Sequence, residues 1–232
     1  MILYVFLVMK TFIVMPAYNE ESKIAGVIKQ LKNKGYDNIV IIDDGSDDNT
    51  FEKAKDEEVF ALRHVINRGQ GAALKTGIDF SLLNNADVII TFDSDGQHDV
   101  NDIKSLINVI EKENYDVVLG SRFLKNTSNV PLVRKIFLKM GALLILFLYG
   151  VKLTDSHNGL RALSRPAAEK IEIRTDRMEH ASEILEQISL KNLKYKEVPV
   201  TIKYTKYSLQ HGQSTWNAFK ILSKMLFRKL IQ

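Results

Sequence analysis

Two aspartates, Asp93 and Asp95, stand two residues apart directly after the apolar run Val88–Phe92. Residues i and i+2 of an extended segment point to the same side, so both carboxylates can face one cation. Oxygen ligands of this kind suit Mg²⁺ or Mn²⁺, and such an ion can bridge a diphosphate. Gln97 is the next candidate metal ligand. For an isolated pair, the alternative is an Asp-rich turn exposed to solvent.

Four more polar segments follow short apolar runs in the same way: Pro16–Glu20, Asp43–Asp48, Asn67–Gly71 and Gly120–Arg122. Asp44 has the position of a carboxylate that accepts hydrogen bonds from a ribose or a base, whereas Asp48 or Asn49 is expected to cap the next helix. The Gly-rich turn Asn67–Gly71 can offer amides to a phosphate or ribose, or simply begin a helix tightly. Arg122 can bind an anion through two parallel hydrogen bonds, or form a structural ion pair.

These segments need a scaffold that brings them together. Short apolar runs predict strands at Thr11–Met15, Ile39–Ile42, Val59–Val65, Val88–Phe92 and Val117–Leu119. Helical patterns alternate with them, at about Glu20–Lys34, after Gly71 and at about Asn101–Glu113. The alternation predicts an α/β fold, Rossmann-like, with a mostly parallel central sheet and helices on both faces. Ligands bind outside the carboxyl ends of such strands, so five polar loops there predict a nucleotide-type site.

The last third of the chain has a different pattern. Helices are predicted over Pro131–Gly150, Met178–Leu190 and Thr215–Leu230, with strand-like pieces on either side of Pro199. The last of these helices is amphipathic, with an apolar stripe beginning at Trp216 and basic residues at Lys220, Lys224 and Arg228. It fits a membrane surface with anionic lipids, a membrane partner subunit, or packing on the core. Without a linker or repeat, residues 1–232 are expected to form a single domain.

Composition excludes several classes of protein. The absence of cysteine excludes disulfides, zinc–thiolate sites and thiol nucleophiles. The near balance of 32 Lys+Arg against 28 Asp+Glu excludes a disordered polyelectrolyte. The glycine pattern of NAD enzymes and the lysine motif of P-loop NTPases are both missing. Basic residues are spread over helices without an aromatic platform, so no nucleic acid partner is expected.

Two apolar runs bear on the membrane. Met1–Met9 and Gly141–Val151 are both too short to span a bilayer, which takes about 20 helical residues. Gly141–Val151 is long enough for a buried helix or for one that lies in a membrane interface. We therefore expect a cytoplasmic protein that is soluble or peripheral at the inner face of the cell membrane.

Five motifs occur in order: Pro16-Ala-Tyr-Asn-Glu20, Asp43-Asp-Gly-Ser-Asp-Asp-Asn-Thr50, Asn67-x-Gly-x-Gly71, Asp93-x-Asp-Gly-Gln-His98 and Gly120-Ser-Arg-Phe123. Together they resemble glycosyltransferase family 2. Within it, Gln97-His98, Gly120-Ser-Arg122 and Asp155…Asn158-Gly-Leu-Arg-Ala162 resemble the dolichol- or polyprenyl-phosphate sugar synthases. Residues 177–183 and 211–216 resemble small family 2 enzymes of surface polysaccharide synthesis.

The resemblance implies a GT-A fold, a UDP- or GDP-linked sugar donor and one divalent metal. A donor-binding half, residues 11–123, would precede an acceptor-binding half, residues 124–232. The implied donor ligands are Pro16, Ala17, Tyr18, Glu20 and Asp44, with Asn67 and Gly71 beside them. Asp93, Asp95 and Gln97 would hold the metal and the diphosphate. An acceptor phosphate would bind Arg122, and Arg134 beside it.

The implied reaction is an inverting displacement at the anomeric carbon, in which metal and arginine stabilise the departing diphosphate. A hydroxyl acceptor needs a base, whereas a lipid phosphate is already ionised. Family 2 enzymes acting on hydroxyls usually carry a Glu-Asp pair that this chain lacks. That favours a phosphate acceptor, so a polyprenyl phosphate is expected, with a lipid-linked glycan as the other candidate acceptor. If a base is used, Asp155 is the first candidate and Glu179 the second. A sugar nucleotidyltransferase and a non-catalytic sugar-nucleotide-binding scaffold are the alternatives.

Overall fold

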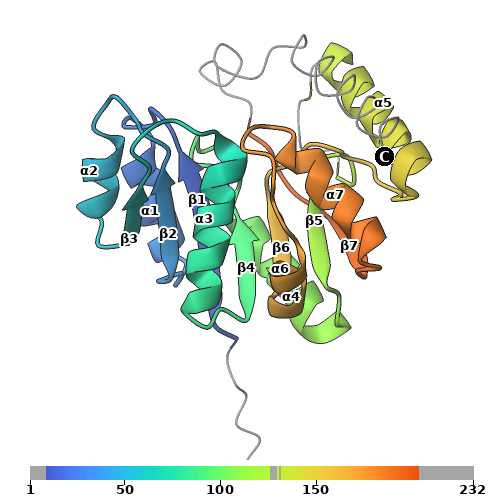
Figure 1. Cartoon of the computed structure of the whole chain (residues 1–232), viewed down its shortest axis with the longest axis horizontal. Coiled ribbons are helices and arrows are strands. Elements are labelled where there is room, and N and C mark those ends of the chain that lie inside the picture. Colours follow the sequence, from blue (N-terminus) through green and yellow to red (C-terminus); the bar gives the residue numbers. More distant parts are fainter. Residues whose placement is uncertain (1–8, 126–129, 131, 204–232) are drawn as a thin grey trace, which may run out of the picture.

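The computed structural model describes residues 9–125, 130 and 132–203, without the side chains of residues 132–134. Within this part, seven strands form one sheet in the order β3-β2-β1-β4-β6-β5-β7 (Figure 1). Their bounds are Thr11–Ala17 (β1), Ile39–Asp43 (β2), Phe60–Arg63 (β3), Val88–Thr91 (β4), Val117–Ser121 (β5), Arg161–Ser164 (β6) and Tyr195–Pro199 (β7). Neighbouring strands are parallel except where β6 pairs with β4 and β5. The predicted α/β architecture is confirmed.

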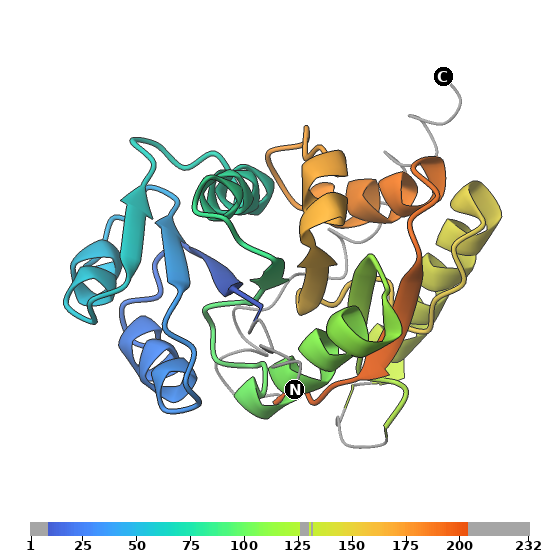
Figure 2. The same ribbon diagram turned by 90° about the horizontal axis from the view of Figure 1, so that it is seen from below.

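Helices cover both faces of the sheet. They are Ile24–Lys32 (α1), Thr50–Lys55 (α2), Gln70–Leu83 (α3), Ile103–Glu113 (α4), Leu132–Tyr149 (α5), Arg165–Lys170 (α6) and His180–Leu190 (α7). Figure 2 shows α1, α2 and α4 on one face and α3, α6 and α7 on the other. Helix α5 lies beyond the β7 edge of the sheet and packs against α7. No helix among the described residues is long and apolar enough to cross a membrane.

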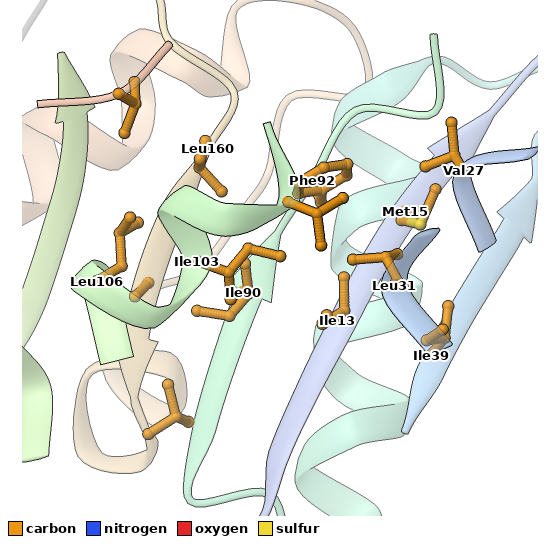
Figure 3. Close-up of a cluster of buried hydrophobic side chains, with 14 of the residues drawn as sticks. Ile13, Met15, Val27, Leu31, Ile39, Ile90, Phe92, Ile103, Leu106 and Leu160 are labelled. Carbon is orange, nitrogen blue, oxygen red and sulfur yellow. The ribbon is translucent and has the colours of Figure 1, made fainter. Parts of the chain in front are cut away.

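The core between the sheet and helices α1 and α4 follows from their amphipathic sequences. Leu31 of α1 and Ile103 of α4 are fully buried. They meet Ile13, Ile39 and Ile90, which project from three strands (Figure 3). A strand buried on both faces must be apolar on both faces, and β2 is apolar until its last residue, Asp43.

On the opposite face, a missing side chain lets α3 lie close to the sheet. A Cβ at Gly77 would stand 2.3 Å from Cγ1 of Val14 and 3.2 Å from Cγ1 of Ile42. Any larger residue there would push α3 away from β1 and β2. This close contact sets the distance between α3 and the sheet.

Several elements differ from the sequence prediction. Strand β6 has no counterpart among the predicted strands. Helix α1 begins at Ile24, since the amides of Lys23 and Ile24 bond the Glu20 carbonyl in a preceding turn. Strand β3 is shorter than Val59–Val65 and partly exposed, as an edge strand can be. The predicted helix over residues 215–230 lies outside the described residues.

Candidate functional site

The polar loops meet at one edge of the sheet. Strands β1, β2, β4 and β5 run in the same direction, so their carboxyl ends share that edge. Because β6 is antiparallel, its first residue, Arg161, lies there too, opposite Thr91 of β4 and Leu119 of β5. The loop before β6 therefore reaches the same edge as the loops after the other strands.

The loops after β1 and β2 are joined by hydrogen bonds. The backbone N–H of Asn19 donates to Ser46 Oγ at 2.9 Å, and that of Glu20 donates to Thr50 Oγ1 at 2.8 Å. Pro16 and Ala17 are buried at the end of β1, whereas Tyr18 is 43% exposed. Of these predicted donor ligands, Tyr18 and Glu20 lie beyond the end of β1, at the edge of the sheet where the polar loops meet. The predicted cap is Asp48, whose Oδ1 accepts the Thr50 N–H, whereas the side chain of Asn49 caps nothing.

Asp44 binds its own chain. Its two carboxylate oxygens accept the backbone N–H of Arg68 at 3.1 Å and of Gly69 at 2.6 Å. His64 Nδ1 lies 2.7 Å from Oδ1, and the Asp44 residue is 3% exposed. The carboxylate we predicted to contact a nucleoside thus ties the loop after β2 to the loop after β3. Contact with a nucleoside stays a prediction.

The Gly-rich turn Asn67–Gly71 is covered by the segment before α7. A Cβ at Gly71 would lie 2.1 Å from the Thr175 carbonyl oxygen, so only glycine fits. The Ala72 amide donates to the Asp176 carbonyl at 3.0 Å, while the side chain of Asn67 is exposed. Amides predicted to bind a phosphate or ribose are thus partly used within the protein.

Two carboxylates at the beginning of α7, Glu179 and Glu183, have different surroundings. Glu183 is buried, and its Oε2 accepts the N–H groups of Arg174 and Thr175, both at 3.0 Å. It therefore holds the turn that covers Gly71. Glu179 stands at the N-terminal end of α7 and is half-buried. Its role as a second candidate base stays a prediction.

Asp93 is held by two donors. His98 Nε2 lies 2.9 Å from Oδ2, and the Gln70 side-chain amide donates to Oδ1 at 3.1 Å. Burial opposes ionisation of Asp93, but the hydrogen bond from His98 and attraction to His98, His180 and Arg161 prevail, so its pKa is lowered. Asp93 is therefore a fixed carboxylate anion.

Asp95 differs from Asp93. Burial, and then repulsion from Asp93, raise the pKa of Asp95. Its Oδ1 accepts the Gln97 N–H at 2.9 Å, and the Gln97 side-chain amide donates to Oδ2. Ser94 between the two aspartates donates to the Pro16 carbonyl at 2.8 Å, which ties this loop to β1. Asp93, Asp95 and Gln97 are thus brought together as predicted.

The group formed by Asp93, Asp95 and Gln97 fits a divalent cation that takes its remaining ligands from a substrate and from water. Within residues 9–203, as far as the structure describes them, no three His, Cys, Asp or Glu side chains form a complete metal site. Mg²⁺ is commonly held by one or two carboxylates together with phosphate oxygens and water. The mutual repulsion of Asp93 and Asp95 is what a cation would relieve.

Arg122 and Asp155 form a buried ion pair. Arg122 Nε donates to Asp155 Oδ2 at 2.6 Å, and the Arg122 backbone N–H donates to the same oxygen at 3.1 Å. The guanidinium also donates to the His157 carbonyl at 2.9 Å. The side chains of Arg122 and Asp155 are only 5% and 0% exposed. We expected Arg122 to bind an acceptor phosphate and Asp155 to act as a base, but in the structure the two side chains bind each other. For Arg122, this arrangement is the structural ion pair that the sequence left as the alternative.

The loop before β6 is fixed at both ends. Glu197 of β7 accepts the N–H groups of Thr154 and Asp155. At the other end, Gly159 lies so close to Asp93 that a Cβ would stand 2.4 Å from Oδ2. Arg161 is buried between this loop and α7, where burial lowers its pKa to about 10 and nearby Asp93 and Asp155 oppose that shift. Arg161 therefore stays a cation at neutral pH.

Sequence reasoning did not assign roles to Gln70, Gly159 or Glu197. Gln70 lies inside a motif singled out for its glycines, and Gly159 lies inside the segment matched by resemblance. Glu197 had no signal, because its partners are about 40 residues away in sequence and only the β5–β7 pairing brings them near. Arg134 was also a candidate, but its side chain lies outside the described part, as do residues 211–216.

Comparison with known proteins identifies the family of this chain. The family model described as glycosyl transferase family 2 matches residues 12–172, more than half of the chain. The chain belongs to glycosyltransferase family 2. The matched range takes in all five polar loops and the loop before β6. As a family 2 glycosyltransferase, the protein is an enzyme, as we expected.

Relatives of this glycosyltransferase cover nearly its whole length. An uncharacterized protein of Methanocaldococcus jannaschii is 44% identical and covers 94% of this chain and 92% of its own. The UDP-N-acetylglucosamine–dolichyl-phosphate N-acetylglucosaminyltransferase of Methanococcus voltae is 37% identical, covering 94% of this chain and 96% of its own. The resemblance to lipid-phosphate sugar synthases is thereby confirmed.

A solved structure confirms the fold of the glycosyltransferase. Glucosyl-3-phosphoglycerate synthase from Mycobacterium tuberculosis, crystallised with Mn²⁺ and UDP-glucose, superposes with a TM-score of 0.71. The match covers 96% of this chain and 78% of that one at 17% identity. The predicted GT-A fold is therefore confirmed.

Proposed function

We propose that this glycosyltransferase moves a sugar from a nucleotide-diphosphate donor to a polyprenyl phosphate at a membrane surface. The observation that carries the proposal is the near full-length similarity to an enzyme named for transfer from UDP-N-acetylglucosamine to dolichyl phosphate. UDP-N-acetylglucosamine is therefore the first donor to test, with other UDP- and GDP-linked sugars beside it.

The buried Arg122–Asp155 pair supports an acceptor that needs no base. Asp155 was the leading candidate for deprotonating a hydroxyl, but its carboxylate is enclosed by Arg122 and the following loop. A phosphate oxygen is already ionised at neutral pH and can attack directly once it is positioned. Attack from the face opposite the diphosphate inverts the anomeric carbon. The new bond joins that carbon to the acceptor phosphate oxygen, and the electrons of the broken bond leave with the nucleoside diphosphate.

The residues around Asp93 fit a bound Mg²⁺ or Mn²⁺. Asp95 would be the principal ligand, because its pKa is raised beside a second carboxylate, with Asp93 and Gln97 next to it. The fold neighbour crystallised with Mn²⁺ and UDP-glucose supports this assignment. When bound, the cation supplies charge that stabilises the departing diphosphate. His98 and Gln70 keep Asp93 oriented, and Gly159 leaves space for it.

Arg161 supplies a second positive charge in this proposal. Its guanidinium is buried, stays protonated and interacts electrostatically with Asp93 and Asp155. A buried cation contributes more to a neighbouring anion than an exposed one does, because less water screens it. Tyr18 and Glu20 border the nucleoside side of the same edge.

The test is a transfer assay on the purified full chain. UDP- and GDP-sugars are each mixed with a polyprenyl phosphate and Mg²⁺ or Mn²⁺, and the lipid product is identified by mass spectrometry. We expect one donor to give a polyprenyl-phosphate sugar with inverted anomeric configuration, which NMR of the product establishes. Transfer to hydroxyl acceptors alone, or nucleotide release without a lipid product, would overturn the proposal. Asp95→Asn serves as the inactive control.

A further inference from the structure

Helix α5 carries a row of apolar side chains that are exposed in the part of the chain that the structure describes. This outer face consists of Ile136, Met140, Leu143, Leu146 and Phe147, whose exposures run from 41% to 84%. Spacings of three and four residues place them on one side of the helix. Single exposed apolar residues are ordinary on protein surfaces, but a contiguous row of five marks an interaction surface.

The opposite face of α5 is firmly attached to the protein. Leu138, Ala142 and Ile145 are buried, and α5 packs on α7. The outer face is therefore presented by a helix with a fixed orientation. In Figures 1 and 2, α5 lies at the end of the molecule farthest from α1 and α2, so a partner on this side would not obstruct the donor-binding half.

Charge indicates what the partner is. Residues 132–149 contain no aspartate or glutamate, and Lys135 and Lys139 are exposed beside the outer face. Lys152 follows the helix and is exposed as well. An apolar face bordered by lysines is typical of helices that lie in the interface of an anionic bilayer. A second copy of this chain would bring like charges together, which disfavours self-association through the same face.

We propose that the outer face of α5 docks on an anionic lipid bilayer. The proposal rests on the function proposed above and adds the surface through which the enzyme reaches its acceptor. The sequence-based docking hypothesis concerned residues 215–230, and Gly141–Val151 was left open between a buried helix and one in a membrane interface.

The docking helix is attached directly to the loop before β6. Ser156 Oγ donates to the Leu138 carbonyl at 3.1 Å, and a Cβ at Gly141 would stand 2.7 Å from Ser156 Oγ. Ser156 follows Asp155, the partner of Arg122. A bilayer bound to α5 would therefore hold this loop near the head groups, where the phosphate of a polyprenyl phosphate lies.

The experiment measures flotation of the full chain with vesicles of phosphatidylcholine alone or mixed with phosphatidylglycerol. The test variant is L143E/F147E, which places two carboxylates on the outer face. The matched control is Leu83→Glu, which changes an apolar residue that is 83% exposed at the end of α3. Thermal unfolding and gel filtration of all three proteins establish that they are folded and report their oligomeric state.

We expect wild type and Leu83→Glu to float with anionic vesicles and to be released by salt, and L143E/F147E to bind about tenfold less or weaker still. Wild-type binding by L143E/F147E would overturn the proposal. So would a wild-type dimer that this variant dissociates without lipid, because the outer face would then be occupied by a second copy.

A second measurement separates this proposal from the proposed function. Each protein is assayed with a short-chain, water-soluble polyprenyl phosphate and with a long-chain one embedded in vesicles. We expect L143E/F147E to retain transfer to the soluble acceptor and to lose transfer to the embedded one. Absence of transfer to either acceptor by wild type would reject the proposed function, while vesicle binding alone would still decide the role of α5.

Discussion

Arg122 Nε lies 2.6 Å from Asp155 Oδ2, and both side chains are buried. Two residues from different loops are thus bound as one unit. Removing one charge of a buried pair leaves the other without compensation, which typically costs about 3–5 kcal/mol of stability.

We therefore expect Arg122→Ala to lower the free energy of unfolding by roughly that amount. The apolar double variant R122M/D155L should recover much of the loss, because it buries no charge. Urea unfolding of the wild type, Arg122→Met, Asp155→Leu and the double variant gives the coupling energy. Additive effects would show that the pair does not act as a unit.

Replacing Asp95 should separate activity from stability. Asp95→Asn removes the ligand best suited to the metal, and we expect turnover to fall by about 10²-fold or more. Stability should stay equal or rise, because repulsion between Asp95 and Asp93 disappears. Initial rates and thermal unfolding measure the two effects. Unchanged turnover would reject the metal assignment.

Gly159 tests how tightly the loop before β6 approaches Asp93. In Gly159→Ala, the new methyl would stand 2.4 Å from Asp93 Oδ2, so loop or carboxylate must move. We expect transfer to fall sharply while the donor still binds, as measured by titration with the nucleoside diphosphate. The control is Gly26→Ala on α1, where a Cβ meets no atom within 4 Å and alanine favours the helix by about 0.5–1 kcal/mol.

Because His180 is buried, we expect the free energy of unfolding to fall in acid. Burial, and then Arg161, lower the pKa of His180 from 6.5 to about 4, against the opposing pull of the Arg177 carbonyl, Asp93 and Glu183. The unfolded chain therefore takes up a proton near pH 6.5 that the folded protein refuses until about pH 4. The stabilisation is present above pH 6.5 and is lost as the pH falls to about 4, by at most about 3 kcal/mol.

The measurement compares wild type with His180→Gln by urea unfolding from pH 7 down to about pH 4. Carboxylates elsewhere titrate in both proteins, so the difference between them isolates His180. Relative to the variant, wild type should lose stability across this window. A constant difference would contradict the prediction.

The parallel half of the fold is predictable from sequence because its signals are local. Strand β2 is a run of apolar residues, and α4 has a strong amphipathic pattern. Each can therefore be recognised as a strand or a helix from its own sequence alone. The aspartates after β4 were placed correctly for the same reason. Their spacing and the preceding strand suffice to direct them to one edge of the sheet.

Strand β6 and the pairing of Arg122 could not be predicted in this way. Residues Arg161–Ser164 are a short segment of mixed character, and only hydrogen bonds to β4 and β5 make them a strand. Arg122 and Asp155 are 33 residues apart, so nothing local shows that they meet. Sequence identified both as chemically capable side chains, but the reversed strand determines that they face each other.

The reversal of β6 makes residues 122–160 an excursion that leaves and re-enters the sheet at one place. Its ends are joined by the Gly120 amide, which donates to the Leu160 carbonyl at 2.9 Å. A segment whose ends meet can change in length or be replaced without shifting the register of any strand. The excursion carries α5 and the loop with Asp155, whereas the donor-side loops lie outside it. It can therefore be exchanged between relatives, by evolution or by grafting, while the loops after β1, β2 and β4 are kept intact.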